Sequence, residues 1–109
     1  MTKNISVIEL KEIIDSNGIE KLTIIDCREV DEFGYCHIDG TTNIPISEFE
    51  DRALKEISKE DTVYLLCHVG GRSARACLFL KERGYTKLVN IAGGLEAWAL
   101  EIDQKFKRY

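Results

Sequence analysis

Short apolar runs alternate along this chain with segments in which apolar residues recur every three or four positions. The apolar runs cover residues 21–26, 62–66 and 88–91, and their length and composition are typical of strands buried on both faces. Helical spacing covers residues 7–17, 47–57, 73–83 and 95–102, with a charged helical turn at 29–33. This alternation predicts an α/β sandwich, in which helices flank both faces of a mainly parallel central sheet.

Capping signals refine two of these helices. Ser6, with Glu9 three residues later, forms a capping-box pattern, and an Asn-Gly pair stops the same helix at Gly18. The segment at 47–57 follows an irregular stretch around Pro45, the only proline, and its helix is predicted to break near Arg52.

The strand predicted at 62–66 runs directly into Cys67, a short glycine-containing loop and the next helix. Ligand sites of parallel α/β sheets lie at the carboxyl ends of strands, which is where Cys67 is placed. Backbone N–H groups of such a loop and the positive end of the following helix favour the thiolate form of a cysteine. A buried structural cysteine is the simpler alternative. It explains neither Gly70 and Gly71 nor Arg72, so the combination favours a nucleophile.

Length, charge and hydropathy narrow the function classes. A chain of 109 residues fits one domain, residues 1–109. Its net charge of −4 argues against nucleic acid as a partner, because phosphate binding needs a basic face. We find no signal-peptide pattern and no run long enough for a membrane span, which predicts a soluble, cytoplasmic protein without a membrane partner. The basic segment at 105–108 is predicted to be a solvated end.

The cysteine spacing argues against a metal or disulfide framework. The four cysteines contain no CxxC pair, and the two histidines do not complete a ligand set with them, so no metal site is predicted. A cytosolic protein of this size neither needs disulfides nor keeps them easily. We expect Cys27 and Cys77 to pack in the core. Cys36 lies in a polar, turn-like segment, and two roles stay open: a structural one, or resolution of an oxidised or persulfidated Cys67 as a disulfide.

Four segments, taken in order, resemble the rhodanese-like domain, and the resemblance covers nearly the whole chain. It rests on IDCRE followed by EF at 25–33, CHIDG with NIP at 36–45, CHVGGRS at 67–73, and GY with GGLEAW at 84–98. The sequence departs from the family pattern at Cys27, Cys36 and Thr41, where aliphatic, glycine and alanine residues are usual. None of these departures touches the loop that begins at Cys67. The resemblance implies a rhodanese-like three-layer sandwich.

The resemblance also implies a chemistry. Cys67 would be the nucleophile that takes sulfane sulfur from a small anionic donor such as thiosulfate, holds it as a persulfide, and passes it to cyanide or a thiol in a ping-pong reaction. No cofactor is implied. Arg72 would be the cation of the loop. The pocket lining is assigned to the residues that follow the cysteine: His68, Val69, Gly70, Gly71, Arg72 and Ser73.

Several neighbouring residues have structural interpretations. We expect His37 to hold a loop through a ring hydrogen bond, and the His68 amide to serve the loop while its ring points outward, with a catalytic ring role left open. Asp26, Arg28 and Glu32 are expected to form an ion-pair network that braces the first loop. Arg75 either attracts anions or is solvated, and Trp98 belongs to the core.

Two other function classes compete. A cysteine phosphatase or arsenate reductase also holds an oxyanion in an amide cradle, but its loop has one more residue between cysteine and arginine than the four found here. Asp39 stays open as a general acid for that chemistry. The second competitor is a persulfide carrier or redox-sensing module that a protein partner loads at Cys67. The loop sequence serves both a carrier and an enzyme.

Overall fold

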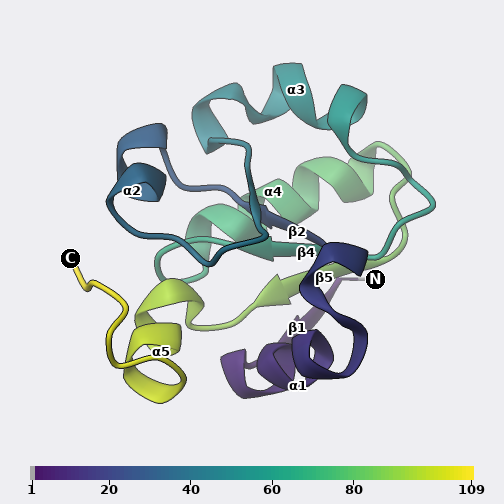
Figure 1. The fold of residues 1–109 in the computed structure, drawn as a ribbon. Coiled ribbons are helices and arrows are strands. Elements are labelled where there is room, and N and C mark those ends of the chain that lie inside the picture. Colours follow the sequence, from purple (N-terminus) through teal and green to yellow (C-terminus); the bar gives the residue numbers. More distant parts are fainter. Residues whose placement is uncertain (1) are drawn as a thin grey trace.

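The computed structural model describes residues 2–109, which form a five-stranded parallel sheet flanked by helices (Figure 1). The strands are β1 (Lys3–Ile5), β2 (Thr23–Asp26), β3 (Thr42–Asn43), β4 (Val63–Leu66) and β5 (Leu88–Ile91), in the spatial order β1-β5-β4-β2-β3. The helices are α1 (Val7–Asn17), α2 (Val30–Tyr35), α3 (Phe49–Glu56), α4 (Gly71–Glu82) and α5 (Gly94–Glu101). Short 3₁₀ turns cover Ile19–Lys21 and Ile46–Glu48.

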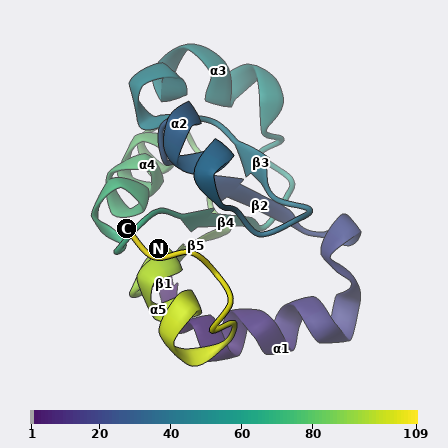
Figure 2. The same cartoon turned by 60° about the vertical axis from the view of Figure 1, so that its left-hand side comes forward.

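The helices form two layers, with α3 and α4 on one face of the sheet and α1 and α5 on the other (Figures 1 and 2). Two buried apolar clusters fill the spaces between the layers. Phe49 and Leu80 belong to the cluster under α3 and α4, whereas Leu10 and Trp98 belong to the one over α1 and α5. The predicted three-layer α/β sandwich and the core position of Trp98 are therefore confirmed.

Strand alternation decides which face each side chain reaches. In β4, Val63 and Leu65 join the α3/α4 cluster, and Leu66 joins the α1/α5 cluster. Cys67 continues this alternation and points to the α4 side, just past the carboxyl end of the strand. In β5, Leu88 lies on the α4 side and Val89 on the other, so Asn90 again faces α4.

The capping box of α1 is present as predicted: the Ser6 hydroxyl accepts from the Glu9 amide, and the Glu9 carboxylate accepts from the Ser6 amide. Gly18 ends this helix with a φ of 87°, a conformation that favours glycine. The predicted break near Arg52 is wrong. The irregular turn ends before Phe49, and Arg52 pairs with Glu48 and Glu56, one helical turn away on either side, which supports a continuous helix.

The prediction of a solvated tail is correct for the exposed basic side chains Lys105, Lys107 and Arg108 but wrong for Phe106 and for the path of the backbone. Phe106 is buried in the cluster of α1 and α5, and Arg108 forms an ion pair with Glu96 at 2.5 Å. These contacts hold the last residues against α5 and bring Tyr109 back to the loop at Cys67. Across residues 2–109, no helix is long and apolar enough to span a membrane.

Candidate active site

Cys67 lies where β4 ends, and its side chain is only 1% exposed. Residues 68–70 turn the chain into α4, which begins at Gly71. Gly70 has a φ of 111°, a left-handed conformation that L side chains rarely adopt, so glycine is needed for this turn. The loop that the sequence predicted between a strand and a helix is therefore present, and it begins at Cys67.

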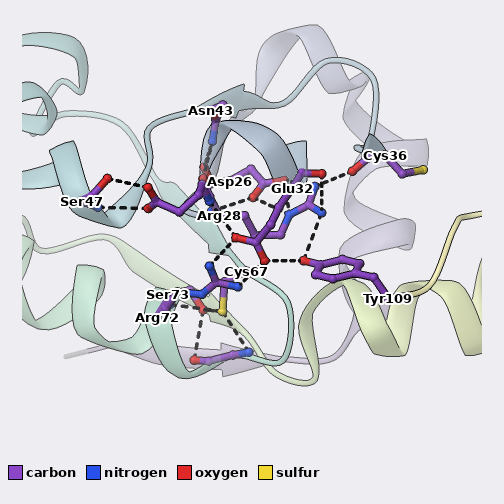
Figure 3. Close-up of polar contacts among 12 residues, drawn as sticks. Asp26, Arg28, Glu32, Cys36, Asn43, Ser47, Cys67, Arg72, Ser73 and Tyr109 are labelled. Carbon is purple, nitrogen blue, oxygen red and sulfur yellow. Dashed lines mark hydrogen bonds and ion pairs between the residues drawn. The ribbon is translucent and has the colours of Figure 1, made fainter. Parts of the chain in front are cut away.

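The sulfur of Cys67 sits in a cradle made by the loop and the first turn of α4 (Figure 3). The Gly70 amide donates to Sγ at 3.0 Å, and the Ser73 amide donates at 3.4 Å. The Ser73 hydroxyl oxygen also lies 3.4 Å from Sγ. Because these N–H groups belong to a helix N-terminus, they present positive partial charge to the sulfur. The cradle is built to hold a sulfur that carries negative charge.

The N-terminus of α5 fixes the loop from the other side. The Leu95 amide donates to the Cys67 carbonyl and the Glu96 amide to the His68 carbonyl, both at 2.9 Å. Gly94 makes this approach feasible, because a Cβ at this position would lie 2.3 Å from the Cys67 carbonyl oxygen. The N-termini of two helices thus meet at the loop. Amides at the start of α4 donate to the sulfur, and amides at the start of α5 donate to the backbone carbonyls of the loop.

Arg72 is engaged by Glu32 of α2. Its Nη1 donates to Oε1 at 2.6 Å and its Nη2 to Oε2 at 2.9 Å, a two-bonded geometry that joins α4 to α2. The Arg72 guanidinium lowers the pKa of Glu32 to about 2, and Glu32 in turn raises the pKa of Arg72. The cation that the sequence assigned to anion binding is therefore already paired with a carboxylate.

A second ion pair lies deeper. Asp26 and Arg28 are fully buried, and Nη2 of Arg28 lies 2.8 Å from the Asp26 carboxylate. Arg28 also donates to the backbone carbonyls of Glu32 and Cys36 (Figure 3). The predicted bracing of the first loop by Asp26 and Arg28 is confirmed, whereas the Glu32 side chain pairs with Arg72 instead. With its bonds satisfied, the buried pair is a structural support for α2.

His68 and Tyr109 close one side of the loop. Their rings stack with centroids 4.1 Å apart, and Nε2 of His68 lies 3.8 Å from the Glu96 carboxylate. The Tyr109 hydroxyl donates to Glu32 at 2.9 Å and accepts from Arg28 at 3.3 Å (Figure 3). The His68 ring thus faces the C-terminal segment. Val69 is 60% exposed at the tip of the loop.

The other cysteines have distinct surroundings, and all four are free thiols. Cys27 and Cys77 are buried as predicted; burial raises the pKa of Cys27 well above its usual value and that of Cys77 to about 12. Cys36 is half-buried beyond α2, and its carbonyl accepts from Arg28. Its proposed resolving role stays a prediction.

Two further expectations concern polar residues near the site. Nδ1 of His37 bonds the Phe33 carbonyl at 2.8 Å and its ring stacks on Phe33, which confirms the structural interpretation. Arg75 is exposed on α4 and lines a hollow with Glu50 and Asp51. In residues 2–109, no three His, Cys, Asp or Glu side chains are grouped so as to hold a metal ion.

Two polar residues at the site escaped the sequence analysis. Asn90 lies in the middle of β5, is 8% exposed, and bonds the Ser73 hydroxyl. A single amide inside the apolar run 88–91 was the available signal, since an amide in a buried strand needs a partner. Tyr109 gave no comparable signal, because its contacts lie 77 and 81 residues away along the chain.

Comparison with known proteins gives consistent matches. A family model described as "Rhodanese-like domain" matches residues 6–101. In Bacillus subtilis, "Putative sulfur carrier protein YrkF" is 38% identical over 94 residues, covering 86% of this chain and 49% of that protein. "Uncharacterized protein YqhL" of the same organism is 40% identical over 88 residues, covering 81% of this chain and 69% of that protein. The chain therefore spans about half the length of YrkF.

Solved structures agree. A rhodanese-like domain protein from Staphylococcus aureus superimposes with a TM-score of 0.80 and 29% identity, covering 98% of each chain. The human single-domain sulfurtransferase TSTD1 has a TM-score of 0.74 and 26% identity, covering 90% of this chain and 96% of that one.

Proposed function

The chain belongs to the rhodanese-like family of sulfur-transfer and sulfur-carrier domains, and from this premise we propose that Cys67 moves sulfane sulfur from a donor such as thiosulfate to a thiophilic acceptor. The observation that carries the proposal is the cradle around Sγ, in which the amides of Gly70 and Ser73 donate to the sulfur at the N-terminus of α4. Such a site stabilises negative charge on sulfur without a metal or cofactor.

The reaction has two displacement steps. The Cys67 thiolate attacks the outer sulfur of thiosulfate; a new S–S bond forms, the old one breaks, and sulfite leaves with the bonding electrons. Cys67 then carries a persulfide, whose outer sulfur is attacked by cyanide or a thiol. This releases thiocyanate or a new persulfide and regenerates the Cys67 thiolate. Substrate contacts are proposed for the loop that follows the nucleophile: His68, Val69, Gly70, Gly71, Arg72 and Ser73.

A single rhodanese-like domain over residues 1–109 would suffice for this cycle. We place it in the cytoplasm, where thiols stay reduced, because all four cysteines are free. The partners are then a small anionic sulfur donor and a thiol or cyanide acceptor, with neither nucleic acid nor membrane involved.

Steady-state kinetics test the proposal. Thiocyanate formation is measured while thiosulfate and cyanide are varied independently, with wild type compared to Cys67→Ser. Parallel double-reciprocal lines for wild type and loss of activity in Cys67→Ser support a ping-pong transfer through Cys67. Full activity in a folded Cys67→Ser protein rules this cycle out.

A protein-loaded carrier is the second candidate, and two observations favour it. The loop cation Arg72 is neutralised by Glu32, so a dianionic donor finds less free positive charge than the loop sequence suggests. Val69, at the tip of the loop, is a 60% exposed apolar side chain, which suits contact with a protein partner better than contact with a small dianion.

The two candidates differ in loading rate. A carrier takes sulfur slowly from thiosulfate and rapidly from a persulfidated protein, whereas a thiosulfate sulfurtransferase loads quickly from the small donor. A small-molecule persulfide serves as the control that needs no protein contact. A phosphatase would instead hydrolyse phosphate esters, so p-nitrophenyl phosphate completes the comparison.

A further inference from the structure

Asn90 connects the sulfur cradle, which follows the central strand β4, to the edge strand β1. Its Oδ1 lies 2.5 Å from the Ser73 hydroxyl oxygen, and its Nδ2 donates to Oδ1 of Asn4 at 3.1 Å. Asn4 and Asn90 are directly paired in the register of β1 and β5. A continuous hydrogen-bonded chain therefore runs from Cys67 through Ser73 and Asn90 to Asn4, from the buried sulfur to an exposed side chain.

The hydrogens available in this hydrogen-bonded series decide whether Ser73 donates to the Cys67 sulfur or accepts from it. The Ser73 hydroxyl has one hydrogen and three neighbours: Oδ1 of Asn90 at 2.5 Å, the Gly70 carbonyl at 3.1 Å and Sγ at 3.4 Å. Because Nδ2 of Asn90 is turned to Asn4, its Oδ1 faces Ser73 and takes that hydrogen. The hydroxyl then offers only a lone pair to Cys67, which suits a thiol that donates its S–H.

A sulfur without a proton needs the opposite arrangement. A thiolate or persulfide cannot donate, so it is better held by a Ser73 hydroxyl that points its hydrogen at the sulfur. That rotation leaves two oxygens 2.5 Å apart with no hydrogen between them, unless the Asn90 amide turns over and donates from Nδ2 to Ser73. Asn4 must then donate to Asn90 in turn. It is exposed, so this reversal costs little.

We infer that Asn90 is a positioning residue that sets the direction of the Ser73 hydrogen bond, and that Asn4 must be free to turn for Ser73 to donate to the Cys67 sulfur. The inference rests on the proposed role of Cys67 as nucleophile. It adds two residues, one of them exposed on β1, that control the nucleophile through a third.

The charged groups around the sulfur leave room for such control. They come from the first turn of α4, from α2 and from the end of β2, and the charges are paired: Arg72 with Glu32, and Arg28 with Asp26. Cys27 is a buried thiol, and the His68 ring faces Tyr109 and Glu96. Since the nearby charges largely cancel, the hydroxyl of Ser73 is the adjustable donor at Sγ.

The test uses a substitution at Asn4 that fixes the direction of the hydrogen bonds between Asn4, Asn90 and Ser73. In Asn4→Asp the new carboxylate only accepts, so it holds Nδ2 of Asn90 and keeps Oδ1 on Ser73. The rate of Cys67 alkylation by iodoacetamide is measured against pH, with peptide mass spectrometry to isolate this cysteine. The midpoint of the profile is expected to rise by about one pH unit, because the thiolate loses a charge-assisted hydrogen bond.

The same substitution in a Ser73→Ala background separates this effect from the added charge. In that background the midpoint is expected to move far less, because the hydrogen bonds from Asn90 no longer reach Cys67 through Ser73. Asn4→Ala alone is expected to leave the midpoint at or below that of wild type. An equal rise with and without Ser73, or no rise in either, overturns the inference. Alkylation needs no sulfur donor, so this inference can be tested even if the protein does not transfer sulfur.

Discussion

Arg72 and Glu32 face each other across the mouth of the Cys67 loop, joined by two hydrogen bonds of 2.6 and 2.9 Å although they lie 40 residues apart in the chain. The side chains are 28% and 19% exposed, so the pair is shielded from solvent but not deeply buried. The pair locks α2 to α4 and removes the free charge from the loop cation. The balance between these two effects determines how the site treats anions.

Removing the Glu32 charge should improve the use of an anionic donor. In Glu32→Gln, Arg72 keeps a hydrogen-bonding neighbour but regains its net charge, so the KM for thiosulfate is expected to fall about fivefold. Asp31→Asn removes a neighbouring charge of α2 without freeing Arg72 and serves as the matched control. An unchanged or higher KM in Glu32→Gln would show that Arg72 does not contact the donor.

Acid should weaken the fold through the same carboxylate. The pKa of Glu32 is lowered from 4.5 to about 2 by Arg72, so its contribution to stability is complete above pH 4.5 and is lost as the pH falls toward 2. Urea unfolding between pH 6 and 3 should show a shallower loss of unfolding free energy for Glu32→Gln than for wild type. Parallel curves would contradict the assignment.

The contact between α5 and the loop depends on the absence of a Cβ at Gly94. In Gly94→Ala, the added Cβ would lie 2.3 Å from the Cys67 carbonyl oxygen, at a φ of 54°, so the loop must move. We expect about 2 kcal/mol less unfolding free energy and slower sulfur loading at Cys67. Gly34→Ala, where an added Cβ meets nothing within 4 Å, is the control for stability. Equal stability of the two variants would argue against a tight α5 contact.

The last residues should contribute to stability. Phe106 is 7% exposed among the side chains of α1 and α5, so Phe106→Ala is expected to lower the unfolding free energy by about 3 kcal/mol. Lys105→Ala, at an exposed neighbouring position, should change it little. Thermal or urea unfolding measures the stability of both variants. An unchanged unfolding free energy in Phe106→Ala would show that Phe106 is solvated, as the sequence predicted for this segment.

Native-state labelling should separate the cysteines. Burial raises the pKa of both the Cys27 and the Cys77 thiol, so both are expected to stay protonated and to react with iodoacetamide at pH 7.5 far more slowly than Cys67 in the folded protein. All four cysteines should react once urea unfolds the chain. Peptide mass spectrometry distinguishes the sites, and rapid native labelling at Cys77 would show that α4 opens locally.

The parts of this protein that could be predicted from the sequence are those set by neighbours in the chain. The capping box at Ser6 and the strand-to-helix loop at Cys67 each depend on a few adjacent residues, and both are present. The break predicted near Arg52 is absent, because ion pairs of Arg52 with Glu48 and Glu56 support the helix through this position.

Contacts between distant segments could not be predicted. β1 has only three residues, two of them exposed, and becomes a strand by pairing with β5. Glu32 was expected beside Arg28, but α2 turns its carboxylate to Arg72. The hydrogen bonds of Tyr109 and Asn90 likewise join residues that no local pattern connects.

The most direct test of the central claim is the intact mass of wild type and Cys67→Ala after brief exposure to thiosulfate, and again after cyanide. A gain of one sulfur atom, about 32 Da, on wild type alone, removed by cyanide with release of thiocyanate, is the predicted result. The same gain on folded Cys67→Ala, or no gain on wild type from thiosulfate or from a persulfide donor, would contradict persulfide chemistry at Cys67.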